Sequence, residues 1–269
     1  MIVREIECKS ILTKSGIEGV DYAINPYVGC GHGCVYCYAT FMKRFTGHKE
    51  DWGTFVDVKV NAAEVLARQM RRAKRGNIAI GTVTDPYQPL ERKHKITHAC
   101  LDVLTAYGFP VSILTKSDLV LRDLDILRRL RDVEVGFTIA TLDEQVRRVF
   151  EPRSSPIPAR LAALSGLTEV GISTWAFCGP LLPFLSDGEE QMDALFGELA
   201  KAGVSYIFVD SMKLSGAIGG KVRRVLERYY PDLVEGYRYI ATNRKPYHEA
   251  LMARARMLAE KHGLAWGGE

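Results

Sequence analysis

The chain has 269 residues, of which 47% are hydrophobic and 25% are charged, and a formal net charge of +4. This composition is typical of one large α/β domain and excludes a disordered chain. Six cysteines are ordinary usage at this length and exclude a disulfide scaffold. The longest apolar runs have the length of strands, so we expect no membrane-spanning helix. Because the N-terminus lacks the apolar core of a signal peptide, we expect a cytoplasmic protein.

A cysteine-rich loop lies early in the chain. Residues 1–20 form a polar lead-in, and residues 21–29 are a candidate first strand that leads into the loop CGHGCVYCY. Cys30, Cys34 and Cys37 have C-x3-C-x2-C spacing, and three thiolates can hold a [4Fe–4S] cluster whose fourth iron stays free. Structural zinc is the alternative, with His32 or the distant Cys8 as the fourth ligand.

From residue 61 onwards, helix and strand patterns alternate. We expect strands at residues 77–83, 111–115, 133–140, 170–177 and 204–209. We expect helices at residues 61–76, 96–107, 121–130, 159–164, 187–203, 221–229 and 247–262. Continuous apolar strands are typical of a parallel sheet covered on both faces. The pattern therefore predicts either an open doubly wound sheet or a barrel.

Polar residues follow several of these strands. Thr84 and Asp85 follow the second strand, Lys116 follows the third, Thr138 lies near the end of the fourth, and Cys178 ends the fifth. In α/β barrels the reacting groups gather at the carboxyl ends of the strands. We therefore expect these residues to surround one polar cavity.

Four stretches of the chain resemble the radical S-adenosylmethionine (radical SAM) enzymes, and among them the spore photoproduct lyase-like group. They are LTKSGIEGVDYAINPYVGCGHGCVYCYA, TVTDPYQPLE, ILTKS and TIATLDEQVRRVFEPRSSPIPARLAAL. The resemblance implies a partial (β/α)6 TIM-like barrel over residues 21–230. The N-terminal lead-in of residues 1–20 would precede this barrel. A C-terminal helical extension of residues 231–269 would pack on it.

The same resemblance implies two cofactors, a [4Fe–4S] cluster on Cys30, Cys34 and Cys37 and S-adenosylmethionine (SAM). The carboxylate of SAM needs a cation, for which Lys116 is the first candidate and Arg153 the second. Thr138 suits the ribose, Thr84 or Asp85 suits the ammonium group, and Tyr36 or Tyr38 can stack on the adenine.

The expected activity is reductive cleavage of SAM to a 5′-deoxyadenosyl radical, which abstracts hydrogen from an unidentified substrate. The electron would come from a donor of the flavodoxin or ferredoxin type. Repair of a DNA lesion, with nucleic acid as the partner, is one alternative, and the mildly basic charge is weak support for it. A non-enzymatic, metal-stabilised binding module is the other.

One position departs from the lyase pattern. Thr82 stands where the lyase carries the cysteine that donates hydrogen to the repaired product. Cys178 is a speculative replacement as the hydrogen donor. Its other interpretation is a small core residue in an apolar strand.

Overall fold

A curved, open sheet of eight strands forms the centre of the molecule. The computed structural model describes residues 1–267. The strand order is β11-β10-β9-β8-β7-β6-β3-β2, and the six strands from β3 to β10 are all parallel to one another. They are β3 (Tyr22–Ile24), β6 (Ile78–Ile80), β7 (Val111–Thr115), β8 (Val133–Thr138), β9 (Ser173–Leu181) and β10 (Tyr206–Ser211). The two edge strands do not pair with each other, so the expected partial barrel is confirmed.

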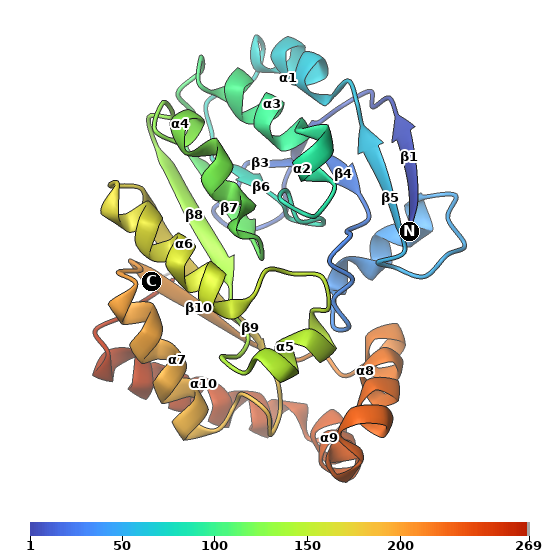
Figure 1. Ribbon diagram of the computed structural model, residues 1–269, viewed down its shortest axis with the longest axis vertical. Helices are drawn as coiled ribbons and strands as arrows, with labels where there is room; N and C mark the ends of the chain where they lie inside the picture. Colours follow the sequence, from blue (N-terminus) through green and yellow to red (C-terminus); the bar gives the residue numbers. More distant parts are fainter. Residues whose placement is uncertain (268–269) are drawn as a thin grey trace.

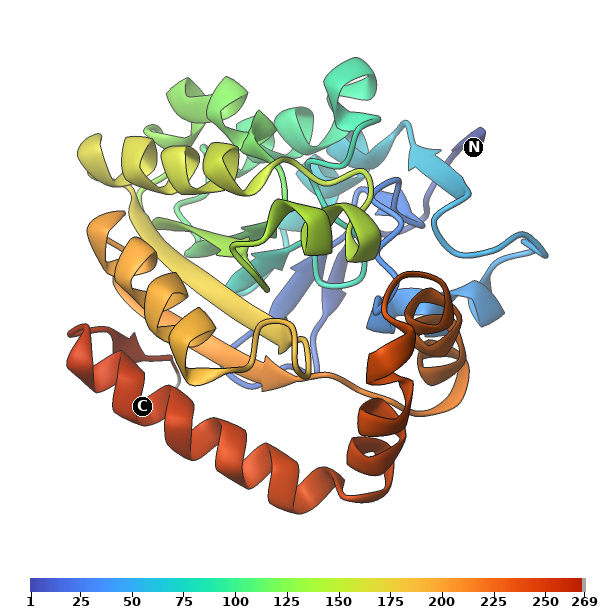
Figure 2. The same ribbon diagram turned by 60° about the horizontal axis from the view of Figure 1, so that its bottom comes forward.

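Helices follow the strands and lie along the outer side of this sheet, as Figures 1 and 2 show. These helices pack on the outer face of the sheet, where the apolar side chains of the strands lie. These helices are α1 (Ala62–Met70), α2 (Glu91–His94), α3 (Ile96–Leu104), α4 (Leu124–Leu127), α6 (Ile157–Glu169) and α7 (Glu189–Lys201). The helix expected at residues 121–130 is a 3₁₀ segment, η2 (Asp118–Asp123), followed by the single turn of α4.

The region around the cysteine loop contains more strands than the sequence predicted. The expected strand at residues 21–29 is divided at Asn25 and Pro26 into β3 and β4 (Tyr27–Val28), because proline cannot donate to a ladder. β4 joins a separate small sheet with β5 (Phe55–Lys59) and β1 (Ile2–Ile6). The cysteine loop therefore leaves from the second sheet and returns through the 3₁₀ segment η1 (Tyr38–Phe45).

The chain ends contribute to the large sheet as well. β2 (Leu12–Lys14) pairs antiparallel with β3, and β11 (Ala265–Trp266) pairs parallel with β10. Between β10 and β11 come α8 (Gly216–Tyr229), η3 (Pro231–Leu233), α9 (Val234–Thr242) and the long α10 (Arg244–Lys261). The expected boundaries at residues 20 and 230 thus cut through one sheet. Residues 268–269 of the expected extension lie outside the described residues.

One large apolar core fills the space between the sheet and its outer helices, and it includes Ile113, Phe137, Leu164 and Phe196. No helix among residues 1–267 is long and apolar enough to cross a membrane.

Replacing Phe196 by alanine tests this core. Phe196 lies on α7 with no exposed surface, so Phe196→Ala leaves a cavity and should lower the free energy of unfolding by about 3–5 kcal/mol. Phe45→Ala is the control, because Phe45 is 66% exposed, and it should change stability by less than about 0.5 kcal/mol. Urea denaturation measures both values, and equal changes would contradict this packing.

Candidate active site

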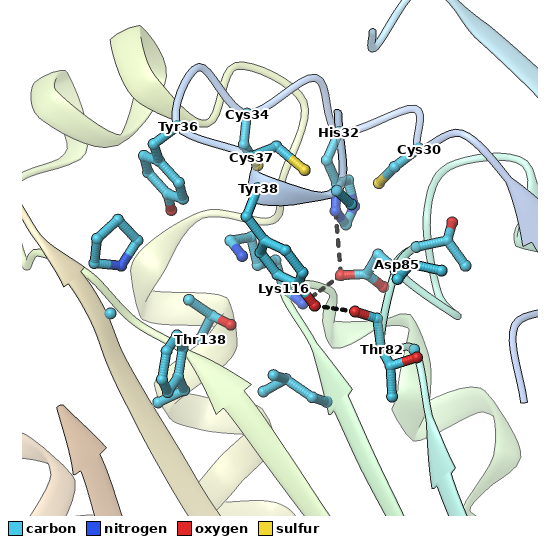
Figure 3. A pocket seen from close by; sticks show the side chains of 18 of the residues that line it. Cys30, His32, Cys34, Tyr36, Cys37, Tyr38, Thr82, Asp85, Lys116 and Thr138 are labelled. Carbon is cyan, nitrogen blue, oxygen red and sulfur yellow. Dashed lines mark hydrogen bonds and ion pairs between the residues drawn. The ribbon is translucent and has the colours of Figure 1, made fainter. Parts of the chain in front are cut away.

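The cysteine loop lies over the carboxyl ends of the parallel strands (Figure 3). Cys30, Cys34 and Cys37 line one cavity of ≈ 280 Å³, together with Lys116 from the end of β7 and Thr138 from the end of β8. The loop depends on Gly33, whose φ of +65° favours glycine. A Cβ atom there would lie 2.4 Å from the Nη2 atom of Arg153. The expected gathering of cysteines and strand-end residues is therefore present.

Three side chains, those of Arg153, Thr84 and Gln88, hold backbone groups in and beside the loop. The Arg153 guanidinium donates to the carbonyl oxygens of Gly31 and Gly53. The Thr84 hydroxyl donates to Gly29 O at 2.5 Å, and Gly31 N–H donates to the Oε1 atom of Gln88 at 2.7 Å. Arg153 does not line the cavity. These contacts give Arg153 and Thr84 a role in shaping the loop, which differs from the SAM contacts we expected for them.

Asp85 is largely buried beneath the loop, and both of its oxygens accept hydrogen bonds. Oδ1 accepts from Thr115 Oγ1 at 2.7 Å and from Tyr87 N–H at 2.8 Å, while Oδ2 accepts from Lys116 N–H at 2.7 Å. Oδ2 also forms an ion pair with His32 Nδ1 at 3.2 Å. Asp85 therefore has little capacity left for the ammonium group of SAM, and it acts instead as a joint between the loop and β7.

The opposite charges of Asp85 and His32 shift the pKa of each residue. Burial alone would raise the pKa of Asp85, but His32 and the hydrogen bonds from Thr115 and Lys116 lower it to about 2. Burial alone would lower the pKa of His32, but Asp85 raises it to about 9. The two residues form a buried ion pair at neutral pH.

Lys116 places a cation beside the cysteines. Its Nζ atom lies 5.7 Å from the centroid of the Tyr36 ring and makes no side-chain hydrogen bond or ion pair within residues 1–267. Burial alone would lower the pKa of Lys116, but Cys34, Glu151 and Asp85 raise it. An ammonium group in this position is available to an anionic group of a ligand.

A buried ion pair that the sequence did not reveal lies behind this cavity. Arg160 has no exposed surface, and its guanidinium donates to Glu151, to Ser154 Oγ and, at 2.8 Å, to the carbonyl oxygen of Thr138. The Tyr36 hydroxyl donates to the other oxygen of Glu151. The pair therefore joins the cysteine loop to β8 and α6. No local sequence pattern could have found it, because Tyr36 and Glu151 are 115 residues apart.

The two tyrosines of the loop differ in exposure. Tyr36 is buried against Glu151, and burial together with that carboxylate raises the pKa of its hydroxyl well above the ordinary value. Tyr38 is 53% exposed and donates from its hydroxyl to the carbonyl oxygen of Thr82. Both line the cavity, so either ring lies where an adenine stacked on it would remain beside the cysteines.

Cys178 does not line the cavity, although its two neighbours Phe177 and Gly179 do. Side chains alternate along a strand, so the side chain of Cys178 enters the apolar core between β9 and the helices. Burial raises the pKa of its thiol. Cys178 therefore does not border the cavity as we expected, and its interpretation as a small core residue fits. Its role as a hydrogen donor gains no support from this position.

The residues present fit an iron–sulfur cluster. Three thiols share one cavity, and the Trp52 side chain, which is 6% exposed, packs against Cys30 and Cys37. The indole N–H of Trp52 has no hydrogen-bond partner among residues 1–267, and such a donor suits a metal-bound thiolate. Within residues 1–267, no three His, Cys, Asp or Glu side chains converge on a single metal ion. Cys8, one alternative zinc ligand, does not line the cavity.

Comparison with known proteins identifies the family. The sequence model of the radical SAM superfamily matches residues 24–209, which is more than half of the chain. The chain belongs to the radical SAM superfamily. It is therefore an enzyme, not a non-enzymatic binding module, and membership implies a [4Fe–4S] cluster and SAM as cofactors.

Relatives of this radical SAM enzyme occur in bacteria and archaea. An uncharacterized protein of Mycobacterium tuberculosis is 34% identical over 97% of this chain and 81% of its own length. An uncharacterized protein of Methanocaldococcus jannaschii is 33% identical over 86% of this chain and 85% of its own length.

Two solved structures share the fold. Spore photoproduct lyase, complexed with dinucleoside spore photoproduct, has a TM-score of 0.73 at 18% identity and covers 98% of this chain and 81% of its own. Streptococcus suis SuiB, bound to SAM, has a TM-score of 0.52 at 15% identity over 79% of this chain and 44% of its own. The resemblance to the lyase-like group therefore extends through nearly the whole fold.

Removing the charge of Glu151 tests the buried ion pair. Burial alone would raise the pKa of Glu151, but Arg160 and Lys116 lower it to about 2 from an ordinary value of 4.5. Its ionisation therefore stabilises the fold above about pH 4.5, and this contribution is lost as the pH falls toward 2. Glu151→Gln should cost about 3–5 kcal/mol at neutral pH, because Arg160 stays buried without its partner.

Urea denaturation at about pH 7 and about pH 3 measures this effect. The difference between the wild type and Glu151→Gln should shrink at the lower pH. Glu198→Gln is the control, since Glu198 pairs with Lys201 at the surface and should cost no more than about 1 kcal/mol. Similar losses in the two variants at neutral pH would contradict the role of the buried pair.

Proposed function

We propose that this radical SAM enzyme holds its [4Fe–4S] cluster on Cys30, Cys34 and Cys37 and binds SAM between the cluster and the ends of β7 and β8. When bound, these cofactors supply a 5′-deoxyadenosyl radical by one-electron cleavage of the S–C5′ bond, with release of methionine, and this radical abstracts hydrogen from a substrate. The observation that carries the proposal is that three thiols and the ammonium of Lys116 line one cavity.

The other residues that we expected at the SAM site then divide into two groups. Lys116 binds the carboxylate of SAM, Thr138 binds the ribose, and Tyr36 or Tyr38 packs on the adenine. Thr84, Asp85 and Arg153 act one step away by fixing the loop that carries the cysteines, since their polar atoms already have partners in the protein. Asp85 and Tyr36 are largely buried, so their side chains also limit the access of water to the cluster.

The electron for SAM cleavage must come from outside the chain. A donor of the flavodoxin or ferredoxin type supplies electrons one at a time and suits a [4Fe–4S] cluster of low potential. Such a cluster also favours a reducing compartment, and on this ground we propose a cytoplasmic location.

Repair of a DNA lesion by a lyase has less support from the site. Among the described residues, the only thiols that line the cavity are those of Cys30, Cys34 and Cys37, all needed for the cluster. Thr82 lines the cavity at the position of the lyase's hydrogen-donating cysteine, and a hydroxyl is a poor hydrogen-atom donor. A reaction that does not require a protein thiol to return hydrogen to the product fits these residues better.

Loss of one cysteine tests the proposed cluster. Anaerobically reconstituted wild-type protein should contain about four irons and four sulfides per chain and form 5′-deoxyadenosine when reduced in the presence of SAM. Cys34→Ala should lose the cluster and this product. Cys178→Ala is the matched control, because its thiol lies in the apolar core, and it should keep both. A wild-type protein that binds stoichiometric zinc and no iron would overturn the proposal.

Replacing Lys116 tests the proposed SAM contact. Lys116→Met removes the ammonium that faces the carboxylate, so the Kd for SAM should rise roughly 10-fold or more. Lys213→Met removes a second cation from the same cavity and is the matched control. Isothermal titration of SAM into each reconstituted protein gives the Kd values. An equal change in both variants would show that Lys116 makes no specific contact.

A further inference from the structure

A second cavity lies inside the barrel, toward the amino ends of the strands. This space, the lower chamber, has a volume of ≈ 580 Å³, against ≈ 280 Å³ for the cavity beside the cysteines. It is lined from β6, β7, β8, β9 and β10 and from the loop at residues 17–20. Five residues line both spaces, so the two adjoin; they are Tyr38, Gly81, Thr82, Leu114 and Phe177.

The alternation of side chains explains this arrangement. On β8, Glu134 lines the lower chamber and Thr138, four residues later on the same face, lines the cavity beside the cysteines. On β10, Tyr206 lines the lower chamber and Asp210 lines the upper cavity in the same way. The inner face of the sheet thus runs continuously from one space to the other.

The charges of the lower chamber have one sign. Its charged lining residues are Glu18, Asp132 and Glu134, and no Lys, Arg or His side chain lines it within the described part of the chain. None of these three carboxylates forms an ion pair with a residue between 1 and 267. Unpaired carboxylates in a half-enclosed space favour a cation and oppose a phosphate group.

Aromatic rings cover the wall of the lower chamber opposite the loop. Trp175 and Tyr206 stack with centroids 5.8 Å apart and an interplanar angle of 7°, and Phe208 meets the Trp175 ring edge-on at 5.4 Å. Gly136 makes room for the indole on β8, because a Cβ atom there would lie 2.2 Å from Cε2 of Trp175. Aromatic faces attract cations and pack on flat apolar groups.

Two polar groups of this wall still have bonding capacity. Trp175 is 7% exposed, and its indole N–H has no hydrogen-bond partner among residues 1–267. The Tyr206 hydroxyl donates to Oε2 of Glu134 at 2.7 Å, and Oε1 of Glu134 has no hydrogen bond within the described chain. Glu134 is therefore oriented by Tyr206 and keeps one oxygen for a donor in the chamber.

We propose that the lower chamber binds the substrate, and that this substrate is a small organic amine in its ammonium form. The ammonium group lies beside Glu134 and the rings of Trp175 and Tyr206, and the rest of the molecule extends toward the wall shared with the upper cavity. This assignment rests on the proposed function, which places the radical source in the upper cavity. It also disfavours a phosphodiester as the group bound in the chamber.

Three probes of similar shape and different charge test the assignment, namely 2-phenylethylamine, 2-phenylethanol and phenylacetate. Each is titrated into the anaerobically reconstituted enzyme with SAM, and binding is followed by saturation-transfer NMR. The amine should bind at least about 5-fold more tightly than the alcohol, and phenylacetate should bind most weakly. Equal binding of the three probes, or no binding of the amine at millimolar concentration, would overturn the assignment.

Substitutions in the lower chamber test whether the amine binds there. Glu134→Gln keeps the shape of the side chain and an acceptor for Tyr206, and it should weaken amine binding about 5-fold while leaving alcohol binding unchanged. Ser112→Lys places a cation in the same chamber and should also weaken amine binding. Glu169→Gln is the matched control, because Glu169 is exposed on α6, and it should bind the amine like the wild type. Unchanged amine binding in both chamber variants would contradict the assignment.

The same samples separate this inference from the proposed function. Formation of 5′-deoxyadenosine without any substrate should persist in Glu134→Gln, because Glu134 does not line the upper cavity. A wild-type enzyme that forms 5′-deoxyadenosine but does not distinguish the probes by charge overturns only the assignment of the lower chamber. A wild-type protein that forms none overturns the proposed function, whatever the probes show.

Discussion

Two largely buried carboxylates, Asp85 and Glu151, hold the cysteine loop against the strand ends. The loop has no regular secondary structure of its own, so it depends on contacts with the strand ends beneath it. Asp85 joins His32 of the loop to β7, and Glu151 joins Tyr36 of the loop to Arg160 on α6. A buried carboxylate is tolerated only when its oxygens are fully bonded, and both residues meet this condition. The same bonding leaves Lys116, between them, without an ion pair of its own among the described residues.

The parallel part of the fold could be predicted because its strands are continuous apolar runs. β7 has the predicted bounds, β8 and β10 lie within two residues of theirs, and β6 lies within three. The strands around the cysteine loop, β1, β4 and β5, were missed because they are short. In addition, β1 and β5 pair although about 50 residues of chain separate them. Such pairing leaves no periodic signal in a single sequence.

The site was predictable only in part, for a similar reason. Cys30, Cys34, Cys37, Lys116 and Thr138 follow from the loop spacing, the strand ends and the family resemblance, and the fold brings them to one cavity. Cys178 was expected at the end of its strand, but β9 continues to Leu181, so the orientation of its side chain depends on the alternation within the strand. Glu151 and Arg160 depend on a tertiary contact, which no local pattern reports.

Gly136 on β8 affects how large a molecule the barrel can contain, because glycine has no side chain. The indole of Trp175 lies in the space that any other residue at this position would occupy. A methyl group at position 136 would push the indole of Trp175 into the lower chamber and shorten this chamber between the amino ends of the strands and the residues it shares with the upper cavity. The absence of a side chain at this one place on β8 therefore helps to set the length of the lower chamber.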